Sequence, residues 1–320
     1  MDIISMYHEH FSGSTVNAHD LNLIQYTEKL FVGTDDVGHT VVVCISNKPN
    51  RVPLKQKTKM LSVECNVRVK YLINGVIEEN TVHIIRCFSN SQKEKDIFLE
   101  LCPLFVEASK QDDQEEAILE AVSILSAFFA NTIEPSDNEL QGLYAELFTI
   151  WSYKDKCNLG RYWQSEDRMK FDFSISDVMK LEVKSTLKNE RKHHFRHEQL
   201  LNEVYDIFIV SYMLRHDDEG LSLSDLINQT KPLIQDDPRK ILIIDRYTKN
   251  TSESRLKEFR FNEYITLAKR KVFIADDVPK FEEQTPTGVT NAEYDCNLDT
   301  VQDIQESVFL DEITRVISAK

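Results

Sequence analysis

Two short segments of alternating polarity carry the side chains best suited to chemistry. In segment 170–175 the apolar residues occupy the odd positions, and Asp172 lies between two of them. In segment 179–184 the odd positions are again apolar, and Glu182 and Lys184 occupy even positions. Such alternation predicts two β-strands, each with one apolar face. The two carboxylates and the ammonium group should therefore share the polar faces of these strands.

The pattern also predicts how the two strands pair. In a hairpin that buries both apolar faces on one side, Phe173 lies opposite Leu181, and Asp172 then lies opposite Glu182. Directly opposed residues have Cβ atoms about 5 Å apart, and like charges at that distance destabilise a sheet. Two opposed carboxylates beside Lys184 are better suited to hold a divalent cation, which prefers oxygen ligands, and to orient a water molecule.

A third acid comes from the preceding helical segment. Leu143, Leu147 and Ile150 repeat at helical spacing and define an apolar stripe, on which Glu146 also lies. A carboxylate on a core-facing stripe costs free energy unless it is paired or binds a metal. Glu146 is therefore the third candidate ligand.

These side chains also admit a purely structural interpretation. Asp172, Glu182 and Lys184 could form a solvated ion network across the hairpin, with Glu146 reaching water at the edge of its stripe. The combination of an acid on an apolar helix face with an Asp and a Glu-x-Lys on one side of a hairpin favours the metal site.

Three nearby histidines suggest an alternative metal site, one for zinc. His193 and His197 have the i,i+4 spacing of a zinc pair on a helix, with His194 beside them. No Cys or His partner stands near them at ligand spacing, so a solvated or phosphate-contacting cluster is favoured.

The ordered series of acids resembles the PD-(D/E)XK nuclease superfamily, whose core has the order helix, strand, strand, helix and strand. More specifically, it is similar to the bacterial PD-(D/E)XK motif proteins of restriction and phage-defence gene clusters. The matching segments are 142–147, 171–173, 181–186 and 198–200, with tail segments 278–281 and 286–294. The likeness covers most of the chain. It departs from the superfamily's name at Phe171, where the name has proline.

The resemblance implies a magnesium-dependent endonuclease and a role for each residue. Asp172 and Glu182, with the carbonyl of Val183, would ligate Mg²⁺, for which Mn²⁺ could substitute, and Glu146 would bind the metal directly or through water. Lys184 would position or help deprotonate the attacking water and stabilise charge on the phosphate. Gln199 would orient the lysine or the scissile phosphate.

The resemblance also implies contacts with the DNA backbone. The cations that follow the hairpin would make them: Lys188, Arg191, Lys192 and Arg196. The formal net charge of −15 opposes DNA binding, but residues 275–320 carry eleven acids against three bases, a net of −8. Segment 184–197 has five Lys and Arg against one Glu, so the distribution of charge leaves a basic region for DNA.

The surrounding elements predict an α/β chain of the α+β kind, and the resemblance implies a restriction-endonuclease-like core. Residues 1–110 are expected to form a β-rich N-terminal domain, with Asn74-Gly75 as a hairpin turn. Residues 111–274 would form a helical bridge and the nuclease core, and residues 275–320 an acidic C-terminal extension.

Local signals predict the helices and remaining strands. Helices are expected over 93–109 and 112–130, and a Ser-x-x-Glu capping box predicts another that starts at Ser136. Apolar runs predict strands over 205–214 and 241–244.

Composition limits the class of protein and its partners. With 41% hydrophobic and 28% charged residues, the chain is not collagen-like, low-complexity or wholly disordered. Six scattered cysteines are typical of reduced thiols in the cytoplasm. The expected partners are DNA and proteins of a restriction or defence gene cluster, with a homodimer allowed and no membrane. The alternative function is a catalytically inactive nuclease-fold subunit that recruits partner proteins, which the acidic tail favours.

Overall fold

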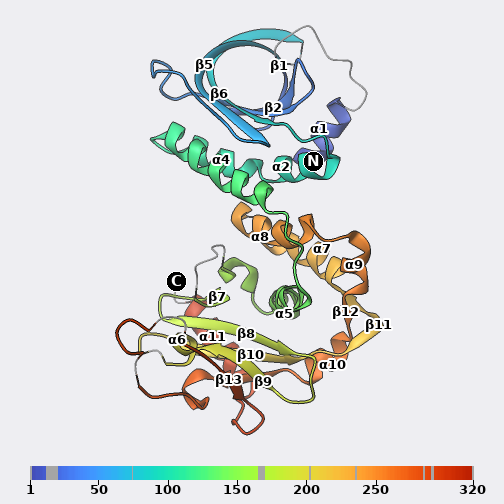
Figure 1. The fold of residues 1–320 in the computed structure, drawn as a ribbon, viewed down its shortest axis with the longest axis vertical. Helices are drawn as coiled ribbons and strands as arrows, with labels where there is room; N and C mark the ends of the chain where they lie inside the picture. The colour runs from blue at the N-terminus through green and yellow to red at the C-terminus, as the bar shows by residue number, and fades with distance from the viewer. Residues whose placement is uncertain are drawn as a thin grey trace. The chain divides into compact units, whose positions relative to one another are not determined.

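The protein is described by a computed structural model that covers residues 2–11, 21–73, 75–164, 170–201, 203–234, 236–283, 285–289 and 292–318. The chain forms two compact units, Met1–Ile133 and Glu134–Lys320 (Figure 1). Helices and several sheets are mixed, so the fold class is α/β. All six cysteines are free. Among the described residues no helix combines the length and the apolar character that a membrane crossing requires.

A closed β-barrel forms the centre of the first unit. Its strands are β1 (Leu21–Gln25), β2 (Leu30–Asp35), β3 (Thr40–Ile45), β4 (Leu54–Lys57), β5 (Leu61–Ile73) and β6 (Val76–Cys87). The order is β1-β2-β3-β6-β5-β4, and β1 also pairs in parallel with β5, which closes the ring seen in Figure 1. Gly33 is required where β2 meets β1, because a Cβ there would lie 1.9 Å from the carbonyl oxygen of Asn22. The predicted β-rich N-terminal region is therefore a barrel.

Four described helices accompany the barrel: α1 (Ile3–Phe11), α2 (Gln92–Glu100), α3 (Cys102–Ser109) and α4 (Gln114–Ala130). The helix predicted over 93–109 is broken at Leu101, because Pro103 in the first turn of α3 lacks an N–H and restricts the backbone before it. Gly75 has the positive φ of a hairpin turn, as predicted, while Asn74 lies outside the described residues.

The second unit contains the candidate chemistry. Its helices are α5 (Asp137–Tyr153), α6 (His197–Leu200), α7 (Leu223–Ile234), α8 (Pro238–Lys249), α9 (Glu253–Glu258), α10 (Glu263–Ala268) and α11 (Glu306–Ser318), with 3₁₀ turns η1 (Leu159–Tyr162) and η2 (Ala275–Asp277). Its strands are β7 (Phe173–Ser174), β8 (Met179–Thr186), β9 (Lys192–Arg196), β10 (Asp206–Met213), β11 (His216–Ser222), β12 (Arg260–Phe261), β13 (Lys271–Ile274) and β14 (Glu293–Asn297).

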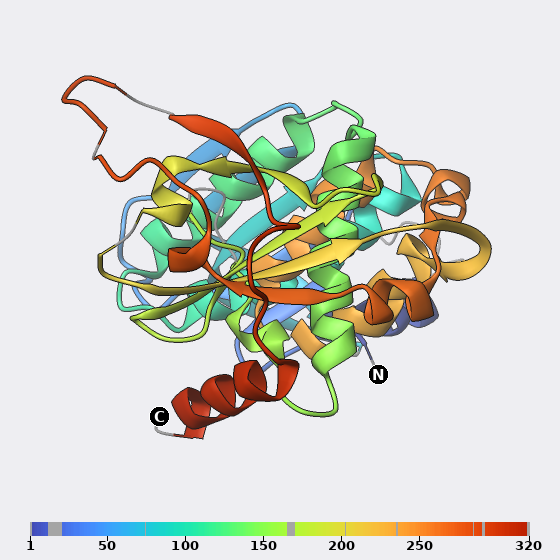
Figure 2. The same ribbon diagram turned by 90° about the horizontal axis from the view of Figure 1, so that it is seen from below.

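A four-stranded sheet of order β13-β10-β8-β7 organises this unit (Figures 1 and 2). β10 runs parallel to β8, whereas β7 and β13 are antiparallel to their neighbours. Helix α5 packs against β8, and Figure 1 shows it nearly end-on beside the sheet. The predicted capping box is present: the Ser136 hydroxyl accepts from the Glu139 N–H, and the Glu139 carboxylate accepts from the Ser136 N–H.

One predicted strand is wrong. Segment 241–244 lies inside α8, whose buried residues follow helical spacing. The Asp237 side chain accepts a hydrogen bond from the Arg239 N–H, and Pro238 occupies the first turn, where its missing N–H costs nothing. A run of four apolar residues cannot by itself separate a buried strand from a buried helix.

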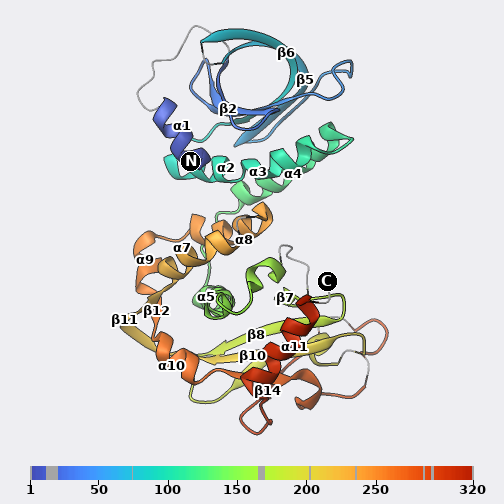
Figure 3. The ribbon, with the colours of Figure 1, turned by 180° about the vertical axis from the view of Figure 1, so that it is seen from behind.

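The expected boundaries at 110 and 274 also differ from the observed division. Helix α4 belongs to the first unit, and the acidic C-terminal part belongs to the second. That part is held by pairing of β14 with β9, by a bridge between Ile304 and Val272, and by Phe309 of α11, whose ring contacts Tyr153 and Phe208. Figure 3 shows α11 beside the sheet. The side chains of Leu298, Val301 and Phe309 are buried, so the C-terminal segment is part of the core.

Candidate active site

The hairpin of β7 and β8 has the predicted register. Phe173 pairs with Leu181, and both are buried. β7 is shorter than predicted, and Asp172 immediately precedes it. The Asp172 carboxylate nevertheless reaches β8, where its Oδ2 accepts a hydrogen bond of 2.6 Å from the Val183 N–H. Asp172 and Glu182 are thus brought to the same part of the hairpin.

Glu182 is a buried carboxylate with one unsatisfied oxygen. The residue is 3% exposed. Its Oε1 accepts hydrogen bonds of 2.7 Å from Lys184 Nζ and 2.7 Å from Gln199 Nε2. Its Oε2 is buried and has no hydrogen-bond partner among the residues that the structure describes. An unpartnered buried carboxylate oxygen costs free energy, and a cation beside it would remove that cost.

Gln199 joins this group from helix α6. Its Nε2 also donates to the carbonyl of Lys170, at 3.2 Å, and its Oε1 accepts from the Arg196 N–H at 3.1 Å and from Lys184 Nζ at 3.4 Å. Lys184 lies over the Phe195 ring, with 5.0 Å between Nζ and the ring centroid. The predicted set of Glu182, Lys184 and Gln199 is therefore directly connected.

Glu146 comes from α5, and its partner was not predicted. Glu146 Oε2 accepts a hydrogen bond of 2.7 Å from Nε1 of Trp163, which follows η1. Trp163 is 3% exposed. No local pattern pointed to it, because it lies seventeen positions from Glu146 and the contact forms only in the folded chain.

The three carboxyls influence one another's protonation. Burial and then the charge of Glu182 raise the pKa of Glu146 to about 7, although the Trp163 hydrogen bond opposes the rise. Burial, followed by the charges of Glu182 and Glu146, raises the pKa of Asp172 well above its ordinary value. Burial also raises the pKa of Glu182, against the opposing charge of Lys184. Crowded, desolvated acids of this kind are a recognised feature of functional sites.

Lys184 remains a cation in this setting. Burial acts to lower the pKa of its ammonium group, but the charges of Glu182, Asp172 and Glu146 together raise it above the ordinary value. The site therefore joins one fixed positive charge to three carboxyls that compete for protons.

The donor set suits a hard divalent cation. Carboxylate oxygens are the ligands that Mg²⁺ prefers, and the unpartnered Glu182 Oε2 would gain a partner. Within the described ranges no group of three or more His, Cys, Asp or Glu side chains is already converged around one point. A metal would therefore have to draw Glu146, Asp172 and Glu182 together.

Three of the four residues predicted to contact DNA are exposed, and one is buried. Lys188, Lys192 and Arg196 are exposed. Arg191 is 3% exposed, and its guanidinium donates to the Ser211 carbonyl at 3.0 Å, to Ser211 Oγ at 2.8 Å and to the carbonyl of Lys269. These contacts tie Arg191 into the core, so we remove it from the set of expected phosphate contacts.

The exposed cations of β9 face carboxylates of β14. Lys192 Nζ lies 3.1 Å from Asp295 Oδ2, and Arg196 Nε lies 3.4 Å from Glu293 Oε1. His194 lies between them, 3.1 Å from each carboxylate, and hydrogen bonds to both raise its pKa. Strand β14 thus places carboxylates beside the cations of β9, which remain exposed.

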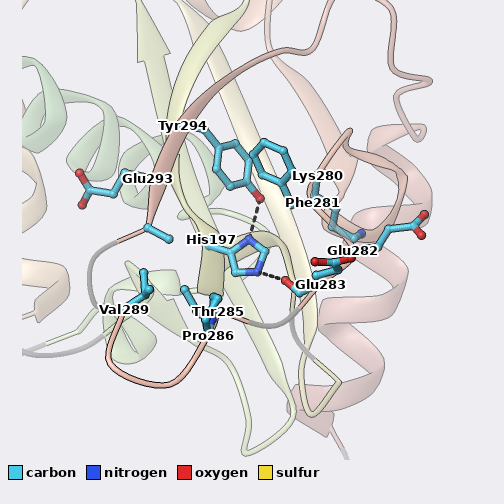
Figure 4. Close-up of a pocket in the computed structure, with 11 residues that line it drawn as sticks. His197, Lys280, Phe281, Glu282, Glu283, Thr285, Pro286, Val289, Glu293 and Tyr294 are labelled. Atoms are coloured by element: carbon cyan, nitrogen blue, oxygen red, sulfur yellow. Dashed lines mark hydrogen bonds between the residues drawn. The ribbon is translucent and has the colours of Figure 1, made fainter.

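The histidines do not form the helical pair that zinc would require. His193 is on β9 and His197 is on α6. His193 Nε2 lies 2.8 Å from Ser211 Oγ, and burial lowers the pKa of the imidazole to about 4. His197 contacts the Tyr294 hydroxyl at 3.1 Å and the Glu283 carbonyl at 3.0 Å (Figure 4). Each therefore has a structural partner.

His197 also lines a pocket of about 620 Å³ (Figure 4). Its walls come from the segment that precedes β14 and from β14 itself. The lining residues are His197, Lys280, Phe281, Glu282, Glu283, Thr285, Pro286, Val289, Ala292, Glu293 and Tyr294. Asp172, Glu182 and Glu146 are not among these lining residues, so the pocket is separate from the carboxylate site.

Comparison with known proteins bears on both units. The chain matches the family model described as "Putative PD-(D/E)XK family member, (DUF4420)" over residues 23–299. No curated protein and no solved structure gives a significant match. The matched range begins in β1 of the barrel, contains all five candidate site residues and ends beyond β14. The chain therefore belongs to the family that this model describes, DUF4420.

Proposed function

We propose that the protein is a Mg²⁺-dependent DNA endonuclease with a restriction-endonuclease-like core, acting in a bacterial restriction or anti-phage defence system. The observation that carries the proposal is the buried Glu182 carboxylate, which has one unpartnered oxygen and is linked to both Lys184 and Gln199. Family membership supports the nuclease class, and Mn²⁺ would substitute for Mg²⁺.

Each residue of the site has a part in this proposal. Glu182, Asp172 and Glu146 would hold the metal, which when bound supplies Lewis-acid stabilisation of the charge on the phosphate. Lys184 carries its positive charge to the phosphoryl oxygens and orients the attacking water. The Gln199 amide fixes the positions of Lys184 and Glu182 through hydrogen bonds to both side chains.

The DNA backbone would meet the exposed cations next to the site. Lys188, Lys192 and Arg196 remain in this role. The rival function is a nuclease-fold subunit without activity that recruits partner proteins. The acidic C-terminal residues favour that rival, whereas the connected set of Glu182, Lys184 and Gln199 favours the enzyme.

Plasmid cleavage with Mg²⁺ or Mn²⁺ tests the proposal. Lys184→Ala should abolish cleavage because it removes the fixed positive charge. Lys180→Ala is the matched control: Lys180 is on the same strand but donates to Ser174 Oγ and the Ser176 carbonyl. Cleavage that persists in Lys184→Ala, or its absence from the wild type with either metal, would remove the assignment.

A further inference from the structure

Trp163 is a buried donor with a single charged acceptor. The indole has one N–H and no acceptor, so a buried tryptophan needs one partner for that group. Its partner is the Glu146 carboxylate, at 2.7 Å, rather than a backbone carbonyl. A hydrogen bond to a charged group is short and directional, so it fixes the orientation of the carboxylate plane.

The same short segment also contacts the start of β7, which Asp172 immediately precedes. Trp163 forms an isolated antiparallel bridge with Phe173. The next residue, Gln164, donates its N–H to the Asp172 carbonyl at 2.9 Å. Two consecutive residues therefore connect an acid of helix α5 to the backbone of an acid beside β7.

We propose that Trp163 is a positioning residue, which orients the Glu146 carboxylate toward Asp172 and Glu182 so that the three acids can share one divalent cation. The inference rests on the proposed function. Trp163 acts through Glu146 and contacts neither the cation nor the DNA. Partners of this outer kind typically change metal affinity by about 10- to 100-fold when they are removed.

A merely structural tryptophan would behave differently, and the chain offers a matched control. Trp151 is the other tryptophan, and its Nε1 donates to Gln229 Oε1 at 2.7 Å. Trp151→Phe also removes an indole N–H hydrogen bond, here one to a neutral amide, without touching a candidate ligand. It should leave the affinity for Mg²⁺ unchanged.

The test is a double-mutant cycle read by Mg²⁺ titration calorimetry on the full chain. Trp163→Phe should weaken Mg²⁺ binding about 10-fold or more, whereas in a Glu146→Gln background the same change should have no further effect. An equal loss in both backgrounds, or no loss in either, overturns the inference.

A second readout keeps Trp163 intact, in case Trp163→Phe does not fold. In Trp151→Phe, Trp163 is the sole tryptophan, so Mg²⁺ should change its fluorescence, and Glu146→Gln should abolish that change. Fluorescence that ignores Mg²⁺ in a protein that binds it also overturns the inference. If the wild type binds no Mg²⁺ by calorimetry, the metal site itself fails, and the positioning role fails with it.

Discussion

Glu182 shows why a single buried carboxylate can be informative. One oxygen is satisfied by Lys184 and Gln199, and the other has no partner in the described part of the chain. A structural ion pair would gain nothing from that second oxygen, because its desolvation is uncompensated. The arrangement is better explained as a site that is completed by a ligand.

Asp172→Asn separates a metal site from an ion network. Without metal, Asp172→Asn should leave the thermal midpoint unchanged or slightly higher, because it removes one of three buried carboxyls that repel one another when ionised. Its amide oxygen can still accept from the Val183 N–H. Mn²⁺ should raise the midpoint of the wild type, as expected for a ligand of the folded state, and should no longer raise that of the variant.

Glu198→Gln is the control for this melt. Glu198 is an exposed carboxylate on α6, 2.6 Å from Lys170 Nζ, and its loss should preserve the Mn²⁺ shift. A wild type that ignores Mn²⁺, together with an Asp172→Asn variant that is less stable, would favour the ion network instead.

The raised pKa of Glu146, about 7, predicts how stability depends on pH. A carboxyl whose pKa is higher in the folded than in the unfolded chain binds its proton more tightly when folded. The metal-free protein should therefore gain stability from this group as pH falls below about 7, and lose that contribution as pH rises through about 7. Thermal melts without metal between about pH 5 and pH 8 check this.

Glu146→Gln should flatten the pH dependence of these melts, because the amide does not titrate. The slope that remains would come from the other crowded acids, Asp172 and Glu182. A variant whose profile matches the wild type would show that Glu146 does not titrate in this range.

At the scale of elements, strands β9 and β14 place opposite charges on one exposed face. Neutralising the acids with Glu293→Gln and Asp295→Asn should free Lys192 and Arg196 and raise DNA affinity. Replacing the two cations with Ala should lower that affinity and reduce the salt slope by roughly 0.9 for each lost phosphate contact. Fluorescence anisotropy with a duplex oligonucleotide across a salt series measures both effects.

A control variant separates this local effect from total charge. Asp113→Asn with Glu79→Gln removes two exposed, ion-paired carboxylates from the first unit. The net charge changes equally, so DNA affinity should rise less than in the β14 variant. An equal rise in both variants would show that only net charge matters, and DNA would then contact another surface.

The hairpin elements could be predicted because their information is local. Alternating apolar residues set the buried face of β8 and the register of β7, and the capping box set the start of α5. The helix α8 was misassigned because a short apolar run is ambiguous, although Asp237 and Pro238 carried a helix-start signal.

The parts of the site that were missed depend on contacts between distant segments. Trp163 meets Glu146 only when η1 packs against α5. The buried Arg191 guanidinium donates hydrogen bonds to Ser211 of β10 and to the carbonyl of Lys269. Both partners are distant in sequence, so no local pattern could predict them. Basic composition alone therefore led to the wrong inclusion of Arg191 among the expected phosphate contacts.

At the scale of the whole molecule, the second unit contains every candidate residue, and the barrel belongs to the first. Family membership extends across both, since the matched residues 23–299 include the barrel strands. The formal charge of −15 is a sum over the whole chain, and it does not show where cations lie beside acids, as on β9 and β14. Net charge is thus a poor guide to the surface beside the carboxylates.

The pairing of β9 with β14 has a consequence for synthesis on the ribosome. His194 and Asp295 are 101 positions apart, so at about 5–20 residues per second the edge of β9 waits about 5–20 s for its partner strand. An unpaired strand edge is a template for joining other chains. Strand β9 has exposed basic side chains at every second position, Lys192, His194 and Arg196. These side chains would protect the nascent chain from aggregation during that interval.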